Sequence, residues 1–349
     1  MKILYLYAEV MSYTMATIRE FSLNYGAEVH VVHWDTKKLT PFQHQPVNKV
    51  SFYGRSLHSI AKIRELAVQV NPDLVVVSGW QDKGYLQVAR MLKKKGVPAV
   101  TGFDDQWFGT FRQRGASSLK FYLKLYFSHA WVSGPYQFEY ARRLGFKKSE
   151  IVFDLYSADL SIYNDVYNES IDTKKKRYPH RFLFVGRFER IKAVELLVKA
   201  WHKLNDKRKD WELQFIGNGS LKSFLQTQTG IMVHDFMQPD RLKDEITAAG
   251  CFILPSRSEP WGVVIHEFTA AGLPIICSDV CGAAPVFLVH GLNGYRFESE
   301  NIDSLVEQML KIINCDDQKL VEMSDVSHQL GQKITPSLSA ANLLSIVKG

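Results

Sequence analysis

Short apolar runs alternate with amphipathic stretches along most of this chain, and that alternation limits the folds open to it. The apolar runs have the length of strands buried on both faces, and the stretches between them carry apolar residues at helical spacing. A strand, a crossover helix and another strand form a βαβ unit, whose strands pair in parallel. The sequence therefore predicts an α/β fold built on parallel sheets.

The alternation occurs in two series, separated by a polar, charged and aperiodic stretch at 156–180. A chain of 349 residues is long for a single core, so we expect two doubly wound domains. The predicted boundaries are a Rossmann-like domain at 1–157, a linker at 158–180, a second Rossmann-like domain at 181–330, and a C-terminal helix at 331–349 that packs back on the first domain. Such domains are expected to face each other across a cleft at the carboxyl ends of their sheets. In the first series the predicted strands are 3–8, 29–33, 74–78, 99–101, 130–133 and 151–153, with helices at 17–25, 60–70, 83–95 and 136–144; in the second, strands are 182–186, 213–217, 231–234, 251–255 and 275–278, with helices at 193–204, 240–249 and 262–271.

Composition excludes several classes of protein. A hydrophobic content of 46% and a charged content of 23% are ordinary for a globular chain and exclude disorder. No apolar run reaches the roughly 18–20 residues that span a bilayer. The start, MKILYLYAEVM, has no small-residue cleavage site and predicts a buried first strand, so we expect a cytoplasmic protein. The four cysteines lack paired CxxC spacing and predict free thiols rather than a metal site.

The net charge of +7 favours an anionic partner. No helix-turn-helix, zinc-finger or RNP signature is present, so we expect no nucleic acid partner. The stretch at 106–127 mixes aromatic and basic residues. One prediction is a surface that contacts an acceptor or an anionic membrane. The other is a core helix with a solvated cationic face, and the pattern leaves both open.

Two strand ends in the second series carry residues suited to phosphate. Gly186 ends a predicted strand, and Arg187 and Lys192 follow it just before a helix N-terminus. Two cations beside the positive end of a helix dipole suit a phosphate group, although such loops are also common without a ligand. The next strand ends in Gly217-Asn218-Gly219, where glycines permit a close backbone approach to a ligand or simply make an ordinary turn.

The segment SRSEPWGVVIHEFTAAGLPII, 256–276, places two glutamates in a mostly apolar run. Glu259 is predicted on a loop at a strand end, and Glu267 lies about one and a half turns inside the helix that follows. The amides of Gly262, Val263 and Val264 lie between the two carboxylates, at the helix N-terminus. Acceptors on either side of exposed amides suit a ligand with hydroxyls at both ends and phosphates between them, as in a nucleotide sugar.

The motifs GRFERIK, IGNG, SEPWGVVIHEFTAAGLPII and HGLNGYRFE, in this order, resemble those of the family-4 retaining glycosyltransferases of GT-B fold with an E-x7-E element. The resemblance covers about 180–300. It implies that Arg187 and Lys192, helped by the amides of Gly262 to Val264, hold a donor pyrophosphate. It also implies that Glu267 accepts hydrogen bonds from the ribose, that Glu259 contacts the transferred sugar, that Phe236 and Met237 line the base, and that 290–294 forms a structural turn.

The same resemblance implies an activity. A sugar would move with retention from a nucleotide-sugar donor, held by the second domain, to a saccharide acceptor, held by the first. A lipid-linked acceptor in envelope polysaccharide or glycolipid synthesis is the leading expectation, with no metal or other cofactor and with peripheral contact to an anionic inner membrane face left open. The catalytic candidates are Glu259, Lys192, Arg187 and Asp104.

The chain departs from the family pattern in its first half. No glycine follows the first strand before Gly26, and Phe103 stands where many relatives carry a histidine, ahead of Asp104, Asp105 and Gln106. The missing histidine predicts either a donor sugar without a 6-hydroxyl or a contact taken over by Asp104, Asp105 or Gln106. Three other functions stay open: a glycosidase using both glutamates, a nucleotide-sugar epimerase of GT-B fold, and a non-catalytic basic binding protein.

Overall fold

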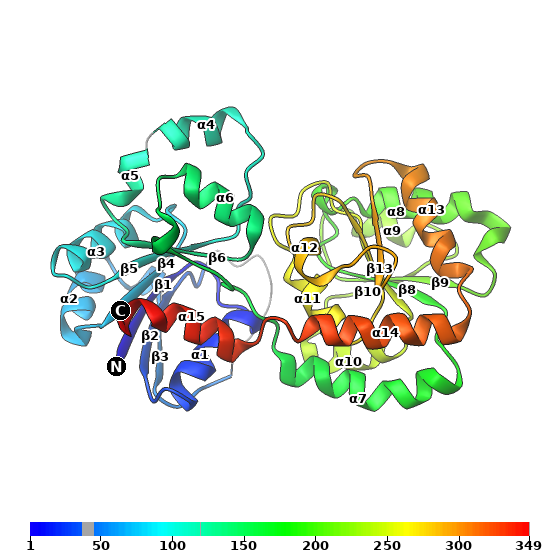
Figure 1. Ribbon diagram of the computed structural model, residues 1–349, viewed down its shortest axis with the longest axis horizontal. Helices are drawn as coiled ribbons and strands as arrows, with labels where there is room; N and C mark the ends of the chain where they lie inside the picture. Colours follow the sequence, from blue (N-terminus) through cyan, green and yellow to red (C-terminus); the bar gives the residue numbers. More distant parts are fainter. Residues whose placement is uncertain (37–44, 119, 349) are drawn as a thin grey trace. The chain divides into compact units, whose positions relative to one another are not determined.

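A computed structural model describes residues 1–36, 45–118 and 120–348, and these form two compact units (Figure 1). The first unit combines Met1–Ser157 with the segment from Ile334 onward, and the second is Ala158–Lys333. Each unit is built around its own parallel sheet.

The first unit contains a seven-stranded sheet in the order β3-β2-β1-β4-β5-β6-β7. Its strands are rich in Val, Ile and Leu because helices cover both faces of a parallel sheet. They are β1 (Lys2–Tyr7), β2 (Glu28–His33), β3 (Val50–Gly54), β4 (Leu74–Ser78), β5 (Ala99–Phe103), β6 (His129–Val132) and β7 (Ile151–Val152). The helices are α1 (Ser12–Leu23), α2 (Ile60–Val70), α3 (Lys83–Lys94), α4 (Phe111–Ser118), α5 (Lys120–Lys124), α6 (Pro135–Arg143) and α15 (Pro336–Lys348).

Alternate residues of β1 supply the two cores of this unit. Ile3 and Tyr5 pack on one face of the sheet, in a cluster that includes Leu343 of α15. Leu4 and Leu6 pack on the other face, in a cluster that includes residues of α2, α3 and α6. Side chains of a strand alternate between faces, so one buried strand serves both layers. The C-terminal helix α15 packs against α1 and is part of this unit.

The second unit contains a six-stranded sheet in the order β10-β9-β8-β11-β12-β13. The strands are β8 (Arg181–Val185), β9 (Glu212–Ile216), β10 (Met232–His234), β11 (Cys251–Leu254), β12 (Ile275–Ser278) and β13 (Gly294–Phe297). The helices are α7 (Leu160–Lys176), α8 (Val194–Leu204), α9 (Lys222–Gln226), α10 (Pro239–Thr247), α11 (Val263–Ala270), α12 (Ala284–Phe287), α13 (Ile302–Ile313) and α14 (Asp317–Gly331).

The linker prediction for 158–180 is wrong, because most of this stretch forms α7. Its charged composition obscured a helical stripe, in which Leu160, Tyr163, Val166 and Ile171 recur every three to five residues and are buried. The helix packs against α10, α11 and α14 and belongs to the second unit.

All four cysteines are free, and Cys251, Cys277 and Cys281 are buried. Within the described part of the chain, no helix combines the length and apolar character that crossing a bilayer requires.

Lys174 in α7 gives a test of this packing. Its side chain is buried, and no described residue accepts a hydrogen bond from its Nζ, so burial lowers the pKa of Lys174 to about 7. The unfolded chain binds this proton below about pH 10.5, whereas the folded chain resists protonation until about pH 7. Stability is therefore lost as the pH falls between these values.

We expect Lys174→Met to raise the free energy of unfolding at pH 7. We also expect the wild type, but not the variant, to lose roughly 2 kcal/mol between pH 9 and pH 7. Urea unfolding at both pH values measures this, with the exposed Lys176→Met as the matched control. Equal pH dependence in wild type and Lys174→Met would contradict the assignment.

Candidate functional site

The predicted residues of the second unit gather where its strand order reverses. β8 lies between β9 and β11, so the connections that leave β8 and β11 run in opposite directions from neighbouring strand ends. Ligands of doubly wound sheets bind at such a switch point, beyond the carboxyl ends of the strands. Lys192 follows β8 and Glu259 follows β11, and their side chains meet there.

Lys192 and Glu259 form an ion pair between Nζ and Oε2. The Ser256 hydroxyl donates to the same carboxylate oxygen at 3.0 Å. The Glu259 residue is only 7% exposed, so its charge is held in place by a cation and a hydroxyl rather than by water. Two of the four catalytic candidates therefore act as one charged unit.

Arg257 joins the loops that carry this pair. Its amide donates to the Ile191 carbonyl at 2.8 Å, and its guanidinium donates to the Arg190 carbonyl. The guanidinium also pairs with Glu195 at 2.7 Å and with Glu300 at 3.0 Å. Arg257 therefore fixes η3 (Arg190–Lys192), the short helix that ends in Lys192, against the Glu259 loop. It was not among the predicted residues, because nothing but its place between two motifs distinguishes it in the sequence.

The glycines after β8 and β9 have a structural reason of their own. A Cβ on Gly217 would lie 1.9 Å from the Gly186 carbonyl oxygen, and one on Gly219 would lie 2.6 Å from the Phe188 carbonyl oxygen. The two loops are joined by a hydrogen bond from the Phe188 amide to the Asn218 carbonyl at 2.8 Å. Close contact between two loops thus requires glycine here, whether or not a ligand is also present.

Helix α11 begins beside Glu259. Gly262 is its N-cap with φ +86°, and a Cβ there would lie 2.9 Å from the Cγ of Glu259. The first amides of a helix have no acceptor within it, so those of Gly262, Val263 and Val264 offer positive charge beside the Lys192–Glu259 pair. This arrangement suits an anion.

Glu267 has a different environment from Glu259. The Tyr163 hydroxyl of α7 hydrogen bonds to the Glu267 carboxylate, and the charge of Asp159 lies nearby. Burial, with a smaller contribution from Asp159, raises the pKa of Glu267 to about 7, although the Tyr163 hydrogen bond opposes the shift. The carboxyl group therefore lies close to its titration point at neutral pH. Sequence reasoning missed Asp159 and Tyr163 because both fall in the stretch interpreted as a linker.

His266, beside Glu267, holds the unit together. Its Nδ1 accepts from the Ala158 amide at 3.0 Å, and its Nε2 lies 2.8 Å from the Gly331 carbonyl, to which it donates. The ring stacks on Phe287 at a centroid distance of 4.1 Å. Burial lowers the pKa of His266 to about 4, so the ring is neutral at pH 7 and can make both hydrogen bonds.

The remaining predicted residues of this unit lie at the same edge of the sheet but are more exposed. Arg187 is exposed directly after β8, and Asn218 uses its Oδ1 to accept from the Gly219 amide at 2.9 Å. Phe236, 37% exposed, and the partly buried Met237 follow β10, which β9 separates from β8. The turn at 290–294 is closed by a hydrogen bond from the Gly291 amide to the Gly294 carbonyl at 2.8 Å.

In the first unit, β5 ends in the apolar residue Phe103, and the acidic residue Asp104 follows it. Phe103 is 5% exposed and packs between Trp80 and Tyr140 in the core. Its neighbour Asp104 lies near Tyr7 and Tyr156. The pKa of both tyrosines is raised, mainly by their burial and to a smaller extent by the Asp104 charge. These tyrosines hydrogen bond to each other and remain protonated at neutral pH.

The backbone that follows Phe103 is held by two glutamine side chains. Gln137 donates to the Asp104 carbonyl at 3.0 Å, and Gln113 donates to the Gln106 carbonyl at 2.7 Å. Asp105 is exposed, whereas Gln106 is 6% exposed. Asp104 lies near two tyrosines, and the Asp105 charge acts on a third, Tyr140; the roles of both acids stay predictions.

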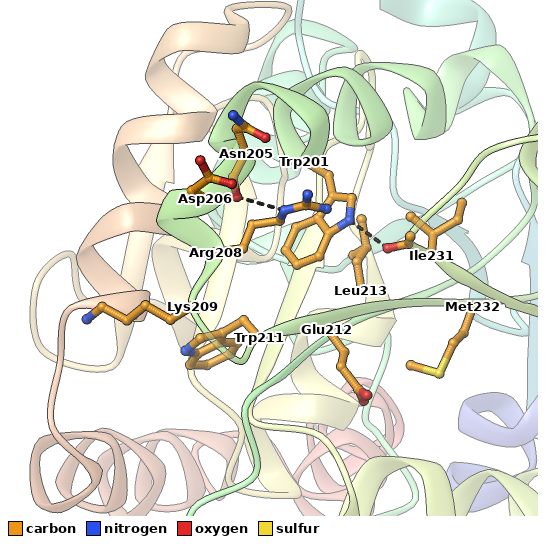
Figure 2. A pocket seen from close by; sticks show the side chains of 11 residues that line it. Trp201, Asn205, Asp206, Arg208, Lys209, Trp211, Glu212, Leu213, Ile231 and Met232 are labelled. Atoms are coloured by element: carbon orange, nitrogen blue, oxygen red, sulfur yellow. Dashed lines mark hydrogen bonds between the residues drawn. The ribbon is translucent and has the colours of Figure 1, made fainter.

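A pocket of about 580 Å³ in the second unit lies at the opposite edge of the sheet (Figure 2). Glu212 and Met232, at the amino-terminal ends of β9 and β10, contribute to its lining, and none of the predicted site residues does. Trp201 donates to the Gly230 carbonyl at 2.8 Å, and the Arg208 guanidinium lies over the Trp201 ring at 4.9 Å. This pocket is therefore distinct from the Lys192–Glu259 site.

In residues 1–36, 45–118 and 120–348 no group of three or more His, Cys, Asp or Glu side chains is arranged to share a metal ion.

Known proteins resemble this chain in sequence. Residues 168–328 match the family described as glycosyl transferases group 1. A putative teichuronic acid biosynthesis glycosyltransferase of Bacillus subtilis is 37% identical over 108 residues, which cover 31% of this chain and 27% of the relative. An uncharacterized glycosyltransferase of Methanocaldococcus jannaschii is 28% identical over 197 residues, which cover 52% of this chain and 54% of the relative. The chain spans less than half of two of these relatives. Its matches cover 27% of the B. subtilis protein and 33% of a second M. jannaschii glycosyltransferase.

Solved structures resemble the chain over its full length. Anabaena HepE in complex with UDP covers 100% of both chains with a TM-score of 0.73 and 14% identity. WaaG, a glycosyltransferase involved in lipopolysaccharide biosynthesis, covers 100% of both with a TM-score of 0.68 and 15% identity. At this identity the likeness concerns the fold alone, and the prediction of a GT-B fold with two Rossmann-like domains is confirmed.

Arg257 provides a test of how the site is held together. Its partner Glu195 is partly buried, with a side chain 22% exposed, and no described residue hydrogen bonds to the buried Glu195 Oε2. We expect Arg257→Met to destabilise the protein by about 2 kcal/mol, because it leaves the Glu195 carboxylate without its cation. Urea unfolding measures the loss.

The control for this variant is Arg181→Met. Arg181 has the same side-chain exposure of 24%, but its nearer partner Glu212 is 55% exposed. Its second partner, Glu245 at 3.7 Å, keeps a hydrogen bond from Gln214 when Arg181 is replaced, so we expect a cost below about 1 kcal/mol. Adding Glu195→Gln to Arg257→Met should restore part of the stability. Equal costs for the two arginine variants, with no restoration, would show that the Arg257 pair is an ordinary surface contact.

Proposed function

We propose that the protein moves a sugar, with retention, from a nucleotide sugar to a saccharide acceptor; the match of residues 168–328 to the glycosyl transferases of group 1 supports this. The observation that carries this proposal is the contact of Lys192, Glu259 and the N-terminus of α11 at the switch point of the second unit. Cationic and amide donors there meet a diphosphate, and the carboxylate beside them meets sugar hydroxyls.

In the proposed reaction the bond between the sugar and the diphosphate breaks, and negative charge grows on the leaving diphosphate. This charge is stabilised by Lys192, Arg187 and the amides of Gly262 to Val264. Because the charge is larger in the transition state than in the bound donor, these contacts lower the barrier to sugar transfer. Glu259 holds Lys192 in place before the donor arrives and orients the transferred sugar. A donor phosphate oxygen accepts the proton of the attacking hydroxyl on the same face of the sugar.

Glu267 is proposed to bind the ribose of the donor. A carboxylate accepts two hydroxyl hydrogen bonds, whereas a protonated carboxyl group accepts fewer. Since the pKa of Glu267 is raised to about 7, donor binding below that pH must first remove its proton. Tyr163 supports the charged form by its hydrogen bond.

The acceptor is proposed to be lipid-linked, at the inner face of an envelope membrane. The names of similar proteins support this choice, since one is a putative teichuronic acid biosynthesis enzyme and another is involved in lipopolysaccharide biosynthesis. Asp104 and the tyrosines near it are the proposed acceptor contacts, because carboxylates and aromatic rings both suit sugars. The nucleotide of the donor is left to experiment.

Lys192→Ala tests the diphosphate site. In a transfer assay with UDP-, GDP-, ADP- and dTDP-sugars, we expect one donor to be used, and kcat/KM for it to fall by about 10²–10³ in this variant. We expect a smaller loss for Glu259→Gln and no loss for Lys199→Ala, an exposed lysine on α8. We also expect EDTA to leave the wild-type rate unchanged. Wild-type turnover by Lys192→Ala would exclude the proposed site.

Glu267→Gln tests the ribose contact through pH. For the wild type we expect the Kd of the nucleotide sugar to rise about tenfold per pH unit below about pH 7, because Glu267 must lose a proton on binding. Calorimetry between pH 5.5 and 8 measures this with the intact sugar nucleotide, whose diphosphate carries no titrating proton in that range. Glu267→Gln should bind weakly at every pH.

Tyr163→Phe is the matched control for this titration. It removes a hydrogen bond that lowers the pKa of Glu267, so the rise in Kd should begin at a higher pH than in the wild type. The same pH profile in all three proteins would remove Glu267 from the donor site.

A further inference from the structure

Helices α4 and α5 of the first unit, with the segments beside them, expose large apolar side chains. Phe111 is 92% exposed and Phe121 is 84% exposed, which are the two highest values among the large hydrophobic residues of the described chain. Single exposed apolar residues are ordinary, but several on adjacent segments indicate an interaction surface. We define the α4–α5 surface as the exposed residues Phe108, Phe111, Arg112, Arg114, Lys120, Phe121, Tyr122 and Leu125; Leu119, between the helices, lies outside the described residues.

The side chains of α5 and the turn after it point in two directions. Leu123 and Phe127 are buried in the core of the unit. Phe121 and Leu125 are four residues apart, so they share a helical face, and both are exposed. The exposed residues therefore do not result from a loose helix, because the same turn is anchored by its buried face. In α4 no residue is buried.

Cations surround these apolar residues. The stretch 106–127 contains Arg112, Arg114, Lys120 and Lys124 and no acidic residue. The backbone of Lys120 lies against Gly145, so the exposed Lys147 and Lys148 follow within a few residues of the contact. Lys124 pairs with Glu150 at 2.6 Å, and the charge of Arg112 acts on Asp105, so Arg114, Lys120 and Lys148 supply the excess charge.

We propose that the α4–α5 surface binds an anionic lipid bilayer, with Phe111 and Phe121 inserted at the interface and the cations against lipid headgroups. Apolar and basic residues on one short segment fit an interface that is itself apolar below and negative above. A second copy of this surface would bring like charges together, so self-association is disfavoured. The inference extends the proposed function, whose acceptor is lipid-linked, but its test uses neither donor nor acceptor.

The test is co-sedimentation of the full chain with vesicles of phosphatidylcholine alone or with 30% phosphatidylglycerol. We expect binding to the anionic vesicles, weakened by salt, and little binding to phosphatidylcholine alone. We expect Phe111→Ser with Phe121→Ser, and separately Arg114→Glu with Lys120→Glu, each to lower the partition coefficient about tenfold or more.

Matched controls alter the same residue types elsewhere on the first unit. Leu57→Ser removes an apolar side chain that is 73% exposed, and Lys62→Glu with Lys83→Glu reverses two exposed cations. These controls should bind within about twofold of the wild type, which supports a local site rather than the net charge of the chain. Thermal unfolding confirms that each variant folds.

Three outcomes would overturn the proposal: no binding of the wild type to anionic vesicles, equal losses in the control variants, or unchanged binding after the phenylalanine substitutions. Concentration-dependent dimerisation lost in Phe111→Ser with Phe121→Ser, in the absence of vesicle binding, would assign the surface to a second copy instead. Sugar transfer to a water-soluble acceptor should be unaffected by all these variants, so failure here differs from failure of the proposed function.

Discussion

Parallel strand pairing is the constraint on which the rest of each unit depends. When all strands run in one direction, every connection must return across the sheet, so the loops at the carboxyl edge lie together. In the second unit the order reverses between β8 and β11, and the loops after these strands turn to opposite faces. Lys192 and Glu259, 67 positions apart in the chain, meet because of that reversal.

At that edge of the sheet, Glu259 and Glu267 have different charged and hydrogen-bonding neighbours. Lys192 and Ser256 both contact the Glu259 carboxylate, and Arg257 joins the two loops through the Arg190 and Ile191 carbonyls. Burial raises the pKa of Glu267 and so favours its neutral form, whereas the Tyr163 hydrogen bond favours the charged form. The two glutamates on this short segment therefore have different partners, a cation and a hydroxyl at Glu259 and the Tyr163 hydroxyl at Glu267. That division suits separate contacts to one ligand better than a matched acid–base pair.

Much of the fold followed from local pattern, and the misses have physical reasons. Buried strands such as β4 and β12 are continuous apolar runs, and Gly and Pro mark their ends, so they were predicted at their observed bounds. β3 and β13 are edge strands with partly exposed residues, so they carry a weaker apolar signal. α7 was missed because charged residues between its buried positions hid the helical stripe. With α7, the partners of Glu267 were missed too.

The sequence by itself determined the class of fold, the positions of the glycine-bounded strand ends, and the chemical identity of the groups at them, because these depend on neighbouring residues. Only the tertiary structure decided which of those groups meet. It placed Phe103 in the core and Asp104 beside tyrosines, and it joined Tyr163 to Glu267 across two helices. Such contacts depend on strand order and on the packing of distant segments, and no local pattern in the chain records either.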